Sequence, residues 1–208
     1  VLGTIGGGGT LLAVPVLVYL MGLPVIQAGS YSMALVGISA WAGTFQYVLK
    51  SSVDYKAALY FAAPSVLTVM LVRWIVVPFL PEVFLEVFGV EIRRDTCLML
   101  LFAFVLILAA SSMLFTKKES DVSGKSYSFV RPLIAFSGFS EGFLTGLVGA
   151  GGGFLIIPAL VHIGQIPMRK AIGTSLLIIA LKSTIGFSID LFLHTVKWDF
   201  FILKAGVC

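Results

Sequence analysis

Residues 1–49 of this chain contain no aspartate, glutamate, lysine or arginine, and neither do residues 142–168. The chain as a whole is 59% hydrophobic and 12% charged, whereas a soluble domain carries about 25% charged residues. A helix that crosses a bilayer needs about 20 largely apolar residues. These long uncharged runs therefore predict an all-α, polytopic integral membrane protein, a multi-pass protein of the cell membrane.

The apolar sequence divides into several candidate membrane segments. They span residues 1–22, 26–49, 57–80, 97–115, 132–163 and 170–192, and another begins at 199. Segment 132–163 is too long for one ordinary span and too short for two. Because residue 1 is Val rather than Met and Cys208 falls a few residues into an apolar run, we expect the natural protein to extend beyond both ends.

Two glycine runs interrupt this apolar sequence. The first comprises Gly6, Gly7, Gly8 and Gly9, and the second comprises Gly149, Gly151, Gly152 and Gly153. A proline follows each run, and Pro158 lies 143 residues after Pro15. The same offset aligns Leu12 with Leu155, Pro24 with Pro167, Ala28 with Ala171, Ser32 with Ser175 and Gly43 with Gly186. Since several glycines together break a helix, we predict two homologous halves that each contain a glycine-broken helix.

The charged residues suggest how these halves are arranged. We predict a first transmembrane repeat at 1–115, a polar cytoplasmic linker at 116–131 and a second repeat at 132–208, because loop Lys and Arg mark the cytoplasmic side. If each broken segment crosses the membrane once, the halves run parallel, and Arg169 and Lys170 fall on the outer side. If a glycine break forms a re-entrant hairpin, the halves are inverted. The sequence leaves both arrangements open.

The glycine runs are candidate binding sites. A half-helix that begins after such a run presents free backbone N–H groups and the positive end of its dipole, which favour an anion. Glycine also lets an anion approach the backbone closely. The alternative is that these glycines are small-residue contacts between helices. Their paired occurrence favours a transporter site between the two halves.

Polar residues near the second break extend this hypothesis. Thr174 and Ser175 lie at the start of the next segment, where their hydroxyls could either cap the helix or bind an oxyanion. Lys182 lies well inside segment 170–192, and an ionisable residue at that depth is a functional candidate. It could neutralise the substrate, or pair with Asp190 or Glu141, although Asp190 lies about 12 Å along the helix and is too far for direct pairing.

Two further charged residues of the apolar segments receive other interpretations. Glu141 lies ten residues into segment 132–163, where it could take part in proton coupling or form a salt bridge. Arg73 lies near the end of its segment. Because a long cationic side chain can extend towards the headgroups, we expect Arg73 to reach the membrane interface.

Enzymatic and nucleic-acid-binding functions find little support. The sequence contains no Gly-Lys-Ser/Thr phosphate loop, and its two histidines and two cysteines form no metal or redox motif. The net charge of +4 comes from short loops between apolar runs, which does not indicate nucleic acid. We therefore expect no enzymatic activity and no cofactor. The expected partners are the lipid bilayer and a small anionic substrate, and a homo-oligomer is left open.

The stretch from Gly146 to Pro158, followed by Pro167 and by Lys170-Ala-Ile-Gly-Thr-Ser175, resembles the sulfite exporter TauE/SafE family of membrane permeases. The stretch from Gly3 to Pro15 resembles its counterpart in the first half. This resemblance implies a transporter of small sulfur-containing anions, such as sulfite or sulfonates, with about eight spans in two halves. We expect alternating access between those halves. A passive anion channel and a membrane subunit of another complex are the alternatives.

Overall fold

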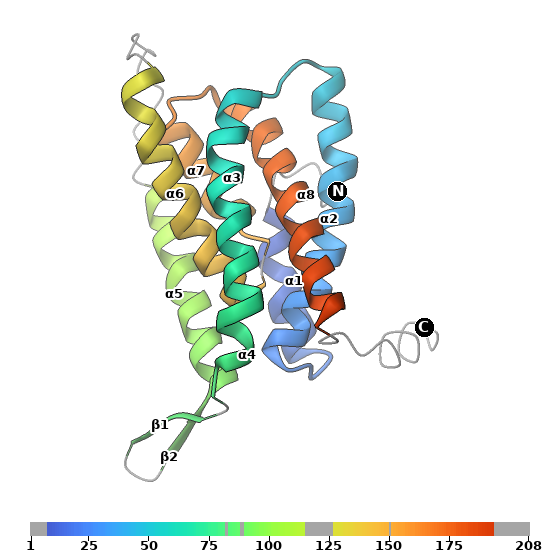
Figure 1. Cartoon of the computed structure of the whole chain (residues 1–208), viewed down its shortest axis with the longest axis vertical. Coiled ribbons are helices and arrows are strands. Elements are labelled where there is room, and N and C mark those ends of the chain that lie inside the picture. The colour runs from blue at the N-terminus through green and yellow to red at the C-terminus, as the bar shows by residue number, and fades with distance from the viewer. Residues whose placement is uncertain (1–7, 82, 88–89, 115–126, 150, 194–208) are drawn as a thin grey trace.

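The computed structural model describes residues 8–81, 83–87, 90–114, 127–149 and 151–193. Its helices are α1 (Gly8–Tyr19), α2 (Val25–Leu49), α3 (Tyr55–Leu71), α4 (Val77–Phe79), α5 (Arg94–Leu114), α6 (Tyr127–Val148), α7 (Gly153–His162) and α8 (Met168–Phe192). A π-helical turn, η2 (Val72–Val76), joins α3 to α4, and a hairpin of strands β1 (Val83–Val87) and β2 (Val90–Arg93) joins α4 to α5. The helices form a bundle from whose lower end the hairpin extends (Figure 1).

The helices confirm the predicted class of an all-α, polytopic membrane protein. Residues 25–49, 55–79, 94–111 and 168–192 form helices that are long and apolar enough to cross a bilayer. Large apolar side chains such as Ile38, Leu100 and Phe136 are exposed, as expected of a surface that contacts lipid. The β-hairpin was not predicted. The segment predicted from residue 199 lies outside the described residues, and α6 begins at Tyr127, within the predicted linker.

Local sequence sets where the long helices begin. Pro24 directly precedes α2 and Pro167 directly precedes α8, consistent with the tolerance of proline at a helix start. The carboxylate of Asp54 accepts a hydrogen bond of 3.1 Å from the backbone N–H of Ala57 and caps α3. Helices α2 and α8 each contain 25 residues. Their bounds differ by the same offset that relates the two glycine runs.

Helices α2 and α8 pack side by side in opposite directions. Gly37 of α2 contacts Ser183 of α8, and Gly186 of α8 contacts Met33 of α2. The residue numbers of these contacts therefore decrease along α2 as they increase along α8, so the two helices are antiparallel. Small residues at these positions let the two backbones approach closely, which is how helices commonly associate in membranes.

Helix α6 packs in parallel against α3 through a row of glycines. Gly138 contacts Phe61, Gly142 contacts Ser65, and Gly146 contacts Val72. A Cβ atom on Gly142 would lie 2.5 Å from the backbone oxygen of Ser65, so this position accepts only glycine at the observed helix separation. These three α6 glycines therefore form small-residue contacts between helices. This is the role that the sequence also allowed for the glycine runs.

The glycine break between α6 and α7 forms a re-entrant hairpin. Helix α6 enters from the upper end of the bundle, and α7 returns towards that end (Figure 1). With ten residues, α7 covers about 15 Å at the helical rise per residue and so begins inside the bundle. Helix α1 also begins inside the bundle and runs to the lower end (Figure 1). The pairs α1–α2 and α7–α8 thus run in opposite directions, the geometry of an inverted repeat.

The re-entrant path also corrects the position of two basic residues. The backbone N–H of Asp54 donates a 2.9 Å hydrogen bond to the hydroxyl of Thr174. This contact places the first turns of α8 beside the α2–α3 loop. Arg169 and Lys170 therefore lie at the same end of the bundle as Lys50 of that loop. Of the two arrangements that the sequence left open, this fits the re-entrant one and not the single crossing that put Arg169 and Lys170 on the outer side. These basic residues share one end of the bundle, as the positive-inside rule favours.

The α3–α6 contact makes a testable prediction for stability. Gly142→Leu should destabilise the folded protein by about 1–3 kcal/mol or more, because overpacking forces the helices apart. Thermal unfolding in detergent measures this effect. Phe139→Leu, on the exposed side of the same helix, is the control and should leave the midpoint nearly unchanged. An equal midpoint for both variants would contradict the close α3–α6 packing.

Candidate functional site

The glycine break depends on backbone conformations that other residues rarely adopt. Gly149, Gly151 and Gly152 have φ values of 78°, 67° and 62°, which lie in the left-handed region. Gly152 is the N-cap residue of α7. These conformations end α6 and redirect the chain within a few residues. The break therefore places the N-terminus of α7 and its exposed N–H groups in the interior of the protein.

A buried ion pair lies beside the N-terminus of α7. Lys182 of α8 pairs with Glu141 of α6, and both side chains are almost completely buried. Thr145 donates a 2.6 Å hydrogen bond to one carboxylate oxygen of Glu141, and Ser65 donates a 2.8 Å hydrogen bond to the other. We call these four residues the Lys182 cluster. Of the two partners suggested for Lys182, the structure selects Glu141.

Gly152 lies directly against the Lys182 cluster. A Cβ atom at this position would overlap the Glu141 carboxylate and the Thr145 hydroxyl, and it would lie 2.6 Å from Nζ of Lys182. The carboxylate of Glu141 is therefore the negative group beside the start of α7. A carboxylate is stabilised at a helix N-terminus by the helix dipole. In this conformation the protein itself supplies an anion at the predicted glycine site.

A second buried ion pair lies nearer the lower end of the bundle. Arg73 in η2 pairs with Asp190 of α8, with side-chain exposures of 1% and 2%. Ser30 of α2 donates a 2.6 Å hydrogen bond to the same carboxylate oxygen of Asp190. We call these three residues the Arg73 cluster. The expectation that Arg73 extends to the membrane interface was wrong, because Asp190 and Ser30 provide polar partners in the interior.

The glycine break connects the two clusters. Gly149 contacts Gly29 of α2 so closely that a Cβ atom on Gly149 would overlap the Gly29 backbone and Nη2 of Arg73. Three residues later, Gly152 contacts Lys182. Lys182 and Asp190 are eight residues apart on α8, which corresponds to about 12 Å along the helix. Two buried cations therefore flank one short stretch of glycine-rich backbone.

The remaining predicted site residues lie elsewhere or outside the description. Gly8 and Gly9 form the first turn of α1, while Gly6 and Gly7 lie outside the described residues. Thr174 accepts its hydrogen bond from the α2–α3 loop, and Ser175 donates a 2.8 Å hydrogen bond to the carbonyl of Ile172. These contacts favour the structural alternative for both hydroxyls, and their role in substrate binding stays a prediction.

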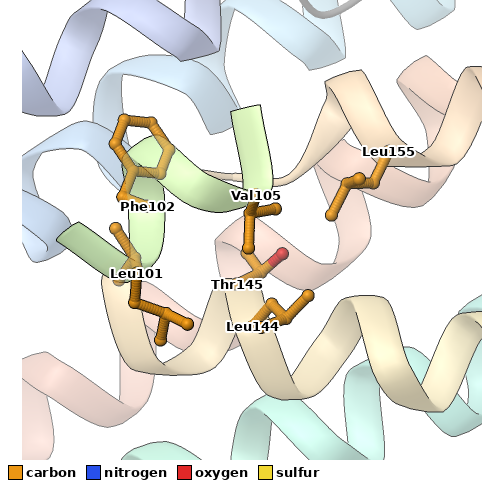
Figure 2. A pocket seen from close by; sticks show the side chains of 7 residues that line it. Leu101, Phe102, Val105, Leu144, Thr145 and Leu155 are labelled. Carbon is orange, nitrogen blue, oxygen red and sulfur yellow. The ribbon is translucent and has the colours of Figure 1, made fainter. Parts of the chain in front are cut away.

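The surroundings of the two clusters differ in access. A cleft of ≈ 340 Å³ reaches Arg73 and Asp190 from the lower end of the bundle, and Gln27 and Arg94 also line it. Beside the Lys182 cluster, a pocket of ≈ 10 Å³ lies between α5, α6 and α7. Leu101, Phe102, Val105, Leu144 and Leu155 surround Thr145 there (Figure 2). That space holds at most about one water molecule.

Sequence reasoning recognised Lys182 but missed the importance of Arg73. Both are cations inside apolar segments, and the same depth argument applied to each. The position of Arg73 near a predicted segment end favoured the interfacial interpretation. Arg73 lies in a π-helical turn that continues into α4, and such turns often occur at functional sites. The following Pro78 is a sequence signal for this irregularity.

A bundle of apolar helices with buried ion pairs around a re-entrant glycine break defines an α-helical membrane transporter. The chain belongs to the sulfite exporter TauE/SafE family, whose model matches residues 1–208. The resemblance inferred from the glycine-proline stretches is therefore confirmed. The protein is a multi-pass protein of the cell membrane.

Curated relatives carry the same general description. A probable membrane transporter protein of Xylella fastidiosa (strain Temecula1) is 30% identical over 209 residues, covering 97% of this chain and 74% of the relative. The probable membrane transporter protein YunE of Bacillus subtilis is 28% identical over 211 residues, covering 93% of this chain and 74% of the relative. No solved structure matches the chain significantly.

The Lys182 cluster predicts a strong coupling between its two charges. Lys182→Met should destabilise the protein by about 3–5 kcal/mol, because it leaves the buried carboxylate of Glu141 without a counter-charge. Adding Glu141→Gln should recover much of this loss, since the amide remains a partner for Ser65 and Thr145 without a charge. Unfolding of the wild type, both single variants and the double variant in detergent measures the coupling. Additive losses would contradict the ion pair.

Proposed function

We propose that this protein transports small anions, specifically sulfur-containing oxyanions such as sulfite or a sulfonate, by alternating access. The single observation that carries this proposal is the glycine break between two buried cations, Arg73 and Lys182. Exposed N–H groups at a helix N-terminus and nearby cations both favour a negative solute. The family description, sulfite exporter TauE/SafE, supports the sulfur oxyanion class.

The arrangement of helices supports alternating access. The α1–α2 and α7–α8 pairs run in opposite directions, and α1 contacts α7 near the centre of the bundle. In transporters built from such inverted elements, one half rocks against the other around a central site. We infer that the predicted repeats at 1–115 and 132–208 are the moving halves, with the linker at 116–131 between them.

The two buried ion pairs lie at different depths in the bundle, which suggests how one transport cycle proceeds. The cleft admits an anion as far as the Arg73 cluster, and the Lys182 cluster closes the path above it. An anion that moves up along the glycine break would compete with Glu141 for Lys182 and for the N-terminus of α7. By the positive-inside rule, the end with Arg169 and Lys170 faces the cytoplasm. The cleft then opens to the outer side in this conformation.

Removal of space at the break should stop transport. Gly152→Ala places a methyl group against the Lys182 cluster, and we expect sulfite flux into proteoliposomes to fall at least about tenfold, since both the site and its cation are displaced. Gly22→Ala is a matched control, because Gly22 has a similar φ of 66° but open space around the added carbon. Flux is compared for protein that is recovered inserted and monodisperse. Normal flux in correctly inserted Gly152→Ala would overturn the proposed site.

Counterflow distinguishes a transporter from a passive channel. Under alternating access, unlabelled sulfite inside the liposomes should accelerate uptake of labelled sulfite, because the loaded protein returns faster than the empty one. A channel would instead show uptake that depends on voltage and is insensitive to internal substrate. We expect acceleration of at least about twofold at saturating internal sulfite. Uptake without any acceleration would favour the channel.

A further inference from the structure

We propose that one edge of the Arg73 guanidinium is the binding seat for the transported anion, and that it selects anions presenting two oxygens side by side. Carboxylates, sulfonates and sulfite belong to this class. The proposal rests on the proposed anion transport and names the residue that recognises the substrate. It assigns recognition to a residue that the sequence indicated only as an interfacial cation.

The hydrogen bonds of Arg73 leave one edge of its guanidinium available. Its Nη1 group contacts Asp190 and lies 3.3 Å from the hydroxyl of Ser30. Its Nε and Nη2 groups are buried and have no hydrogen-bond partner among the described residues. These two N–H groups lie on the same side of the planar guanidinium. Together they form a fork whose spacing fits two oxygens of one oxyanion.

The backbone of two glycines lies close to this edge. Nη2 lies only 3.1 Å from the position that a Cβ atom on Gly29 would occupy, and a Cβ atom on Gly149 would overlap Nη2. Because both positions are glycine, no side chain from either one occupies the space beside Nη2. The π-helical turn that carries Arg73 changes the helical register locally. The combination holds a buried cation in place while two of its donors stay unpaired.

The cleft connects this seat to one face of the membrane. Arg73, Arg94, Asp190 and Gln27 line it at the end of the bundle formed by the α1–α2 loop and the start of α5. Among the described residues, its charged lining consists of two arginines and one carboxylate, so their surplus charge is positive. A positive cleft with low-dielectric walls attracts anions and raises their local concentration. An anion that enters from this side approaches Arg73 as well as Arg94.

The comparison with the α7 N-terminus favours Arg73 as the first seat. Glu141 already provides a negative group to Lys182 and to Gly152, and both of its oxygens accept hydroxyl hydrogen bonds. A substrate there must displace a fully bonded carboxylate. At Arg73 it gains two charge-assisted hydrogen bonds without displacing Asp190. The structure thus assigns recognition to Arg73 and leaves the Lys182 cluster as the next step along the path.

Binding to purified full-length protein tests the seat directly. Methanesulfonate, chloride and uncharged dimethyl sulfone serve as probes, with affinity obtained from ligand-dependent thermal stabilisation in detergent. The wild type should bind methanesulfonate at least about tenfold more tightly than chloride and should not respond to dimethyl sulfone. Arg73→Lys keeps the charge but lacks the fork, and it should weaken methanesulfonate binding at least about tenfold. Arg169→Lys, an exposed change at the opposite end, is the control.

Each outcome decides the proposal. Unchanged methanesulfonate affinity in folded Arg73→Lys would overturn it, as would equal affinity of the wild type for methanesulfonate and chloride. If Arg73→Lys does not fold, the wild-type selectivity alone decides in the same way. Sulfite flux in proteoliposomes separates this inference from the proposed function. Equal sulfite flux in wild type and Arg73→Lys would refute the binding seat at Arg73 but would leave the proposed transport intact. Sulfonate binding through Arg73 without any wild-type flux would support the binding seat but refute the proposed transport.

Discussion

Polar groups inside the hydrocarbon of a bilayer must find their partners within the protein, and this requirement governs the structure of this transporter. In the described part of the chain, continuous helices meet it in most places, and a glycine-rich break interrupts them between α6 and α7. There the backbone turns back inside the bundle, and the start of α7, which no side chain caps, lies beside the Glu141 carboxylate. This irregular backbone thus lies beside both buried ion pairs of the described bundle.

The buried ion pairs have different roles because their hydrogen bonds are completed to different degrees. Both oxygens of Glu141 accept hydrogen bonds in its pair with Lys182. Arg73 is held at one end by Asp190, its Nε and Nη2 are buried without a hydrogen-bond partner among the described residues, and it lines a cleft. We propose that the fully bonded pair acts as a barrier and the partly bonded pair as the anion site. A transporter in a single conformation needs both, since only one side of the site is accessible at a time.

The sequence was sufficient for the class of fold and indicated candidate site residues, whose role in binding stays a prediction. Uncharged runs predicted the spans, and the repeated glycine-proline spacing predicted the break at Gly149–Gly153. Lys182 was recognised from its depth alone. The sequence left open whether the break crosses or returns, because hydrophobicity does not encode direction. It also misplaced Arg73, since its partners Asp190 and Ser30 are distant in the chain and meet it only through the packing of α2, α3 and α8.

The most direct test of this account is an experimental structure of the protein with bound selenite, a heavier analogue of sulfite, located by its anomalous scattering. The account predicts a re-entrant turn at Gly149–Gly153 and a selenium peak within hydrogen-bonding distance of the free edge of Arg73. A continuous helix through residues 132–162, or selenium bound only away from both buried cations, would contradict it.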